Sequence, residues 1–96
     1  MRRAARVDAN HTEIVAALRA AGCSVSSIGS VGGGLPDLVV GRAGMNYLLE
    51  VKDGAKSPSA RRLTGDELVW HENWRGSVET VYSVQDALEA VGLAAA

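Results

Sequence analysis

Residues 36–52 read PDLVVGRAGMNYLLEVK, and this stretch decides how the chain folds. It holds two short apolar runs, residues 38–40 and 47–49. Between them lie the turn-forming residues RAG at 42–44. Apolar runs of this length around a glycine-containing turn are typical of a β-hairpin, so we expect two neighbouring strands here.

The two ends of this stretch carry charged side chains. Because side chains alternate between the faces of a strand, Glu50 and Lys52 must point the same way while Val51 points to the opposite face. Pairing of the two runs would bring Asp37 beside Glu50. Two carboxylates with an adjacent ammonium make an oxygen-rich pocket that suits a hard divalent cation such as Mg²⁺. Such a pocket fits hydrolysis of a phosphodiester.

Helix-capping signals mark three further elements. Asn10 with Glu13 fits a capping box, in which each residue satisfies a backbone N–H of the other. Thr64 with Glu67 repeats the pattern, and Ser83 is a third capping residue. We therefore expect an α/β (α+β) fold, a small mixed β-sheet flanked by helices in the order α-β-β-β-α-β-α. The expected helices cover residues 10–21, 64–74 and 84–91, and the expected strands cover residues 23–28, 38–40, 46–51 and 78–82.

Length and composition indicate one small soluble domain. The 96 residues suffice for a single core and are too few for two. The lone Cys23 excludes an internal disulfide, and no apolar segment approaches the roughly 20 residues that span a bilayer. The opening MRRAARV lacks the apolar stretch of a secretory signal, so we expect a cytoplasmic protein with a basic arm at residues 1–8 and a frayed tail at residues 94–96.

The net charge of −1 is not that of a strongly basic DNA-binding protein, but the charges are unevenly distributed. Basic residues gather in the N-terminal arm and in the loop at 53–62, whereas residues 63–96 are mainly acidic. These clusters either contact nucleic acid or merely solubilise exposed loops. The candidate nucleic-acid-binding residues are Arg2, Arg3, Arg6, Lys56, Arg61 and Arg62.

The order of these features resembles the VRR-NUC (virus-type replication-repair nuclease) domains of the PD-(D/E)XK nuclease superfamily. The resemblance rests on Glu13 in a helix, GLPD at 34–37, EVK at 50–52 and Leu63-Thr64 opening the next helix, and it covers nearly the whole chain. It implies a restriction-endonuclease-like fold with a single nuclease domain over residues 1–96. It also implies a Mg²⁺- or Mn²⁺-dependent DNA endonuclease, similar to Holliday junction resolvases, that cuts branched DNA as a homodimer in a phage or bacterial host cytoplasm.

The resemblance also implies a role for each residue of the site. Asp37, Glu50 and the backbone carbonyl of Val51 would bind the metal, and Glu13 would join them directly or through water. Lys52 would hold or polarise the attacking water, and in-line attack would leave a 5′-phosphate. The predicted catalytic residues are therefore Glu13, Asp37, Glu50 and Lys52.

Glu13 and Glu67 each have a second explanation. A capping box alone accounts for Glu13 at the start of its helix. Related domains usually carry Gln where this chain has Glu67. Glu67 therefore completes its own capping box, forms a stripe with His71 and Arg75, or tunes the site, and we do not predict it to be catalytic.

The remaining aromatic and histidine residues have simpler interpretations. Trp70 and Trp74 are one helical turn apart, a spacing that allows stacking on DNA bases but is more often found in a core or a subunit contact. His11 and His71 lack an acidic partner at a telling spacing, and we expect ordinary roles for both.

Two other classes of function remain open. A non-catalytic nucleic-acid-binding module would use the basic arm and the loop at 53–62. Such a module gains nothing from clustering Asp37 and Glu50 where the phosphate backbone would lie. A metal-free interaction protein, stabilised by these charge pairs, is the third possibility.

Overall fold

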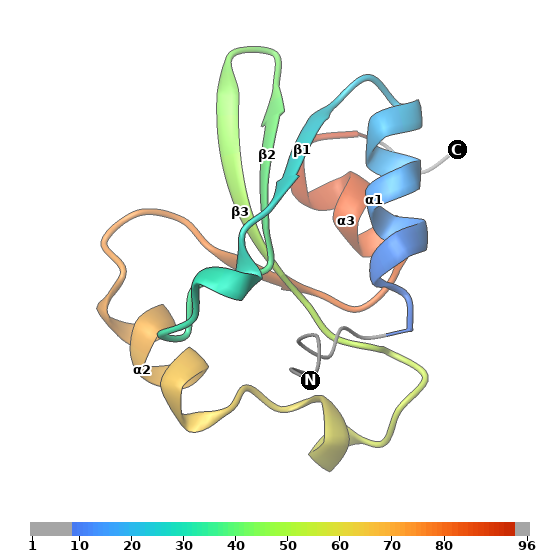
Figure 1. Ribbon diagram of the computed structural model, residues 1–96. Helices are drawn as coiled ribbons and strands as arrows, with labels where there is room; N and C mark the ends of the chain where they lie inside the picture. Colours follow the sequence, from blue (N-terminus) through green and yellow to red (C-terminus); the bar gives the residue numbers. More distant parts are fainter. Residues whose placement is uncertain (1–8, 94–96) are drawn as a thin grey trace, which may run out of the picture.

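The computed structural model describes residues 9–93 (Figure 1). The predicted contacts of Arg2, Arg3 and Arg6, and the predicted fraying of residues 94–96, lie outside this range. The elements are α1 (His11–Ala20), β1 (Ser24–Ser27), the 3-10 turn η1 (Gly29–Val31), β2 (Leu38–Arg42), β3 (Met45–Val51), the 3-10 turn η2 (Pro58–Arg61), α2 (Gly65–Asn73), β4 (Glu79–Val81) and α3 (Val84–Ala90).

The four strands form one mixed sheet in the order β1-β2-β3-β4. β1 pairs with β2 and β2 with β3 in antiparallel fashion, whereas β3 and β4 are parallel. A parallel pair needs a long crossover, and here residues 52–78, which include α2, provide it. The predicted small mixed sheet with flanking helices is therefore confirmed.

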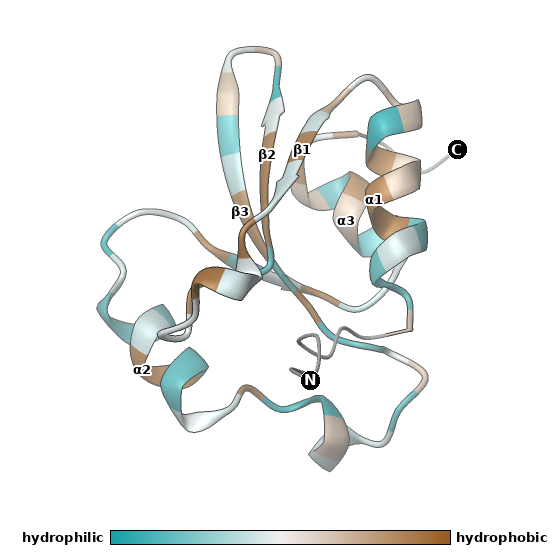
Figure 2. Ribbon diagram, viewed as in Figure 1, coloured by the Kyte–Doolittle hydropathy of each residue, from teal (hydrophilic) through white to brown (hydrophobic). Residues whose placement is uncertain are grey.

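The hydrophobic core lies between the sheet and the pair α1 and α3, which pack side by side over one of its faces (Figures 1 and 2). Leu38 and Leu49 are register partners and are both buried on this face. Because side chains alternate along β3, Glu50 points to the opposite face. The core residues are Ile14, Val15, Leu18, Cys23, Val25, Leu38, Val40, Leu49, Val51, Val81, Ala87 and Val91.

The three helices are short and differ in how they are held. Helices of seven to ten residues are unstable alone in water, so packing must supply most of their stability. α1 buries three of its side chains in the core, whereas none of the nine residues of α2 is buried. No helix between residues 9 and 93 is long and apolar enough to cross a membrane.

Two of the three predicted helix caps are confirmed. The Oγ1 of Thr64 accepts a hydrogen bond from the backbone N–H of Glu67 at 3.3 Å, and the Glu67 carboxylate accepts one from the backbone N–H of Thr64 at 2.8 Å. The hydroxyl of Ser83 accepts from the N–H of Asp86 at 3.0 Å at the start of α3. These local signals therefore define where α2 and α3 begin.

The predicted capping box of α1 is wrong. Asn10 precedes the helix, but among the described residues its side chain caps no backbone N–H. Its Nδ2 instead donates to the carbonyl oxygens of Lys52 at 3.2 Å and Tyr82 at 3.1 Å. Asn10 thus ties the start of α1 to the ends of β3 and β4, and its burial follows from this role.

Candidate active site

The register of β2 and β3 places Asp37 next to Glu50. Leu38 lies opposite Leu49 in antiparallel register. Asp37, which precedes Leu38, therefore lies opposite Glu50, which follows Leu49. The Oδ2 of Asp37 accepts a hydrogen bond from the backbone N–H of Val51 at 2.8 Å. The Asp37 carboxylate is therefore fixed at the end of β3.

Glu50 is the least ordinary group of the site. Its side chain is only 2% exposed, and its Oε1 has no hydrogen-bond partner among the described residues. The pKa of Glu50 is raised from 4.5 to about 9, first by burial and then by the negative charges of Asp37 and Glu67 and a hydrogen bond with Glu67, and the Lys52 ammonium opposes this rise. A buried carboxylate with an unpartnered oxygen is destabilising when ionised, so burial favours a proton or a further cation at Glu50.

Lys52 connects Glu50 to α2. Its Nζ lies 2.8 Å from the Oε1 of Glu67 and 3.6 Å from the Oε2 of Glu50, and its side chain is 11% exposed. An ammonium held between two carboxylates has a restricted position. Lys52 therefore presents a positive charge beside the two predicted metal ligands.

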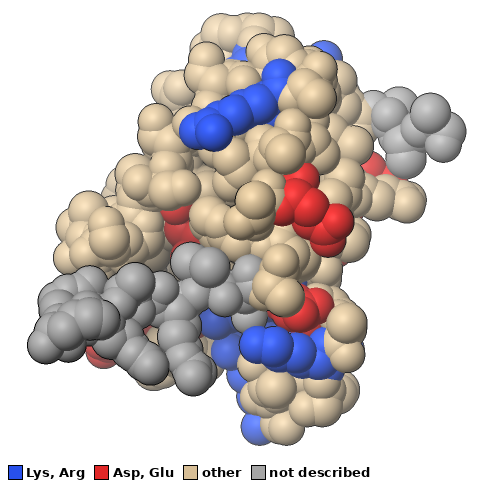
Figure 3. All heavy atoms as spheres, turned by 45° about the vertical axis from the view of Figure 1, so that its right-hand side comes forward, with Lys and Arg blue, Asp and Glu red and all other residues tan. Residues whose placement is uncertain are grey.

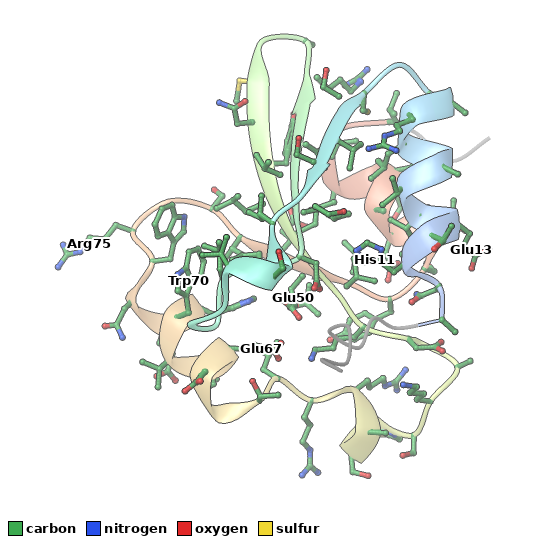
Figure 4. All side chains as sticks on the ribbon, viewed as in Figure 1. His11, Glu13, Glu50, Glu67, Trp70 and Arg75 are labelled. Carbon is green, nitrogen blue, oxygen red and sulfur yellow. The ribbon has the colours of Figure 1, made fainter. Side chains whose placement is uncertain are left out.

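Glu67 has two functions that the sequence patterns left undecided. Its Oε1 accepts from Lys52 Nζ and from the N–H of Thr64, both at 2.8 Å, so a single oxygen caps α2 and binds the ammonium. Burial raises the pKa of Glu67, but the hydrogen bonds from Lys52 and Thr64 outweigh it and leave the pKa below its usual value. Figure 4 shows Glu67 on α2 beside Glu50.

His71 lies one helical turn beyond Glu67, and its ordinary role stays a prediction. Its Nε2 is buried and has no hydrogen-bond partner within residues 9–93. Burial lowers the pKa of His71 and the charge of Lys52 lowers it further, against the opposing effect of Glu67. His71 is therefore a neutral group at neutral pH. Its i+4 spacing from Glu67 predicts that the two side chains are neighbours on α2.

The glycine-rich segment at 29–34 passes between Asp37 and α2. A Cβ atom at Gly29 would lie 3.0 Å from the Oδ1 of Asp37, and one at Gly34 would clash with the carbonyl oxygen of Asp66. Gly34 also has a φ of +85°, which other residues rarely adopt. The backbone of Gly29 thus lies close to Asp37 and that of Gly34 lies close to α2, which leaves little room for a side chain at either position.

The structure does not bring Glu13 to the other three predicted catalytic residues. Glu13 is exposed on α1, which covers the face of the sheet opposite to Glu50 (Figure 4). It lines a separate hollow with Asp53, Arg61 and Gln85. The sheet separates Glu13 from the Asp37 carboxylate, so we do not include it among the candidate metal ligands.

The basic loop contributes fewer exposed cations than its sequence indicates. The Nη1 of Arg61 donates to the carbonyl oxygen of Gly54 at 3.0 Å, and its guanidinium lies 5.6 Å from the centroid of the Tyr82 ring. Arg61 therefore has a structural role within the loop. Lys56 and Arg62 are exposed, and Figure 3 shows Lys and Arg side chains gathered at the lower end of the molecule.

The tryptophan pair does not belong to the hydrophobic core. The rings of Trp70 and Trp74 stack with centroids 4.6 Å apart, but Trp74 is 45% exposed. The spacing of the pair predicts a core or a subunit contact. The core alternative is wrong, because α2 lies outside the layer formed by the sheet with α1 and α3, and the subunit contact stays a prediction.

The site brings together two of the predicted side-chain ligands, Asp37 and Glu50. In the part of the chain that the structure describes, no group of three or more His, Cys, Asp or Glu side chains is arranged to hold a metal ion. The remaining candidate ligand, the carbonyl oxygen of Val51, is a backbone group.

Comparisons of the chain with protein-family models, with curated proteins and with solved structures return no match. The geometry and chemistry of the site, together with the sequence motifs, therefore carry the functional argument.

Proposed function

We propose that this protein is a divalent-metal-dependent endonuclease that hydrolyses phosphodiester bonds in DNA. The observation that carries the proposal is the buried Glu50 carboxylate, whose Oε1 has no partner among residues 9–93 and which lies beside Asp37 and Lys52. The resemblance of the motifs to VRR-NUC domains supports the same activity, and it supports a restriction-endonuclease-like arrangement of the sheet and helices.

The chemistry of the donor set fits a hard divalent cation. Asp37, Glu50 and the carbonyl of Val51 would supply oxygen ligands, the kind that Mg²⁺ and Mn²⁺ prefer. Mg²⁺ is usually held by one or two carboxylates and completes its shell with water and substrate phosphates. With Asp37, Glu50 and Glu67 ionised, Lys52 offsets one of the three negative charges, and a dication would balance the other two.

Lys52 would supply the second positive charge at the reacting phosphate. When bound, the divalent cation supplies Lewis-acid neutralisation of the phosphodiester. The Lys52 ammonium is already oriented by Glu67, so it needs little reorganisation to stabilise charge that develops on the phosphoryl oxygens. It would also orient the water that attacks in line with the leaving 3′-oxygen, which leaves a 5′-phosphate.

A cleavage assay with matched variants tests the proposal. We would incubate the protein with branched, nicked, single-stranded and duplex DNA in Mg²⁺, Mn²⁺ or EDTA. Asp37→Asn and Lys52→Ala should each reduce the cleavage rate about 10²- to 10³-fold, the loss typical of a single electrostatic group. Glu72→Gln, an exposed change on α2, should cleave like the wild type.

The controls separate this activity from two alternatives. Equal cleavage by the wild type and both site variants would indicate a contaminating nuclease and would refute the assignment. Binding of DNA without metal-dependent cleavage would instead favour the non-catalytic nucleic-acid-binding module.

A further inference from the structure

The two tryptophans of the chain form a stacked pair at the outer part of α2. Their ring planes are inclined by 16°, and the centroids are 4.6 Å apart. A hollow opens beside them, with apolar walls from Val69 and from both rings. The residues lining this tryptophan hollow are Gly33, Asp66, Val69, Trp70, Asn73 and Trp74.

The walls of the tryptophan hollow are apolar, and its edges are polar. Val69 is 57% exposed and Trp74 is 45% exposed, so both present apolar surface to the hollow without filling the core. The Nδ2 of Asn73 donates to the carbonyl of Val69 at 2.9 Å, which fixes the amide at the rim. Asp66 adds a carboxylate at another edge, which disfavours a phosphate or an acidic peptide in the hollow.

The tryptophan hollow and the candidate active site share α2, because Trp70 lines the hollow and Glu67 binds Lys52 from the same helix. Trp70 follows Glu67 by three residues, so its backbone lies about 4.5 Å further along the helix axis. Trp74 directly follows the last residue of α2. The Trp70 ring also contacts His71 edge to face, with centroids 6.0 Å apart. Figure 4 shows Trp70 and Glu67 on the same helix beside Glu50.

We propose that the tryptophan hollow binds an unpaired nucleobase of the DNA strand whose phosphate lies at Asp37 and Glu50. The inference rests on the proposed function and extends it to the substrate class, which is DNA with unpaired bases next to the cut. An aromatic face accepts any base by stacking, whereas a base in a duplex must first be unstacked.

Intrinsic tryptophan fluorescence tests this inference without any cleavage. Because both tryptophans line the hollow, their emission reports on it alone. We would titrate the full chain in EDTA with a ten-nucleotide oligothymidylate and with the same strand annealed to its complement. The single strand should quench the emission saturably, and the duplex should do so at least tenfold more weakly.

Variants on α2 make the test specific to the stacking surface. Trp74→Leu should weaken binding of a dye-labelled single strand about 5- to 100-fold, as loss of one stacked base does. Trp74→Phe keeps an aromatic face and should stay within about threefold of the wild type. Leu68→Ala, exposed on the same helix but outside the hollow, should bind like the wild type.

Three outcomes would overturn the inference. The first is equal quenching by single strand and duplex, and the second is wild-type affinity in a folded Trp74→Leu protein. The third is emission that changes with protein concentration in the absence of DNA, which would assign the hollow to a second copy of the chain. Metal-dependent cleavage with unchanged emission would refute the nucleobase site alone, whereas saturable quenching without cleavage would refute only the proposed activity.

Discussion

The ionised Glu50 carboxylate that would bind a metal also destabilises the metal-free fold. An ordinary glutamate ionises with a pKa of 4.5, but burial, Asp37 and Glu67 raise the pKa of Glu50 to about 9. The folded chain therefore binds a proton that the unfolded chain has released over this range. By linkage, the free energy of unfolding falls as the pH rises from about 4.5 to 9.

This linkage predicts a pH dependence in the metal-free protein. Between pH 7 and 9, above the range in which His71 titrates, the free energy of unfolding should fall by about 1–2 kcal/mol. Glu50→Gln carries no charge, so it should abolish this fall and be more stable than the wild type at pH 9. Urea denaturation in EDTA at several pH values measures the effect.

Glu50→Gln should also weaken the stabilisation of the folded protein by metal. Millimolar Mg²⁺ at pH 8 should raise the Tm of the wild type, because a cation that binds only the folded state stabilises it. Glu50→Gln should lose most of that gain, and the exposed change Glu72→Gln should retain it. A Glu50→Gln protein with the wild-type pH profile would contradict the role of this carboxylate.

α2 is the element whose attachment differs most from the rest of the fold. None of its nine residues is buried, and its contact with the sheet side includes the Lys52–Glu67 bond. A helix held in this way should open locally, without unfolding the core. By contrast, α3 contributes Ala87 to the core, so its cap should support the whole fold.

A matched pair of cap deletions tests this difference between the two helices. Each of Thr64→Ala and Ser83→Ala removes an N-cap worth about 1 kcal/mol. Thr64→Ala should speed amide exchange in α2 about fivefold and leave the Tm almost unchanged. Ser83→Ala should lower the Tm by about 4–8 °C. Equal falls in Tm for both variants would show that α2 is part of the cooperative core.

The elements also show which features a sequence can predict. Thr64, Glu67 and Ser83 act within four residues of their partners, and their spacing alone predicts the starts of α2 and α3. Asn10 has the same local signature, yet its amide bonds to carbonyls 42 and 72 residues away. Long-range partners of this kind depend on tertiary packing, which a local pattern does not contain.

In the candidate site too, some placements follow from local sequence patterns and others depend on tertiary packing. Alternation along one strand predicts that Glu50 and Lys52 share a face, and hairpin pairing predicts that Asp37 joins them. Two other placements depend on which face of the sheet each helix covers. Glu13 lies over the far face and Glu67 reaches Lys52 from α2, and neither result follows from spacing.

For the whole molecule, we propose a two-fold homodimer, because a branched DNA junction needs paired incisions and each chain supplies a single site. Light scattering should then give twice the chain mass of 10.0 kDa at micromolar concentration. If the tryptophan hollow holds a base, the dimer contact must lie elsewhere, so a single-stranded oligonucleotide should leave the dimer intact. A monomeric mass at about 100 µM would exclude paired incision by one assembly.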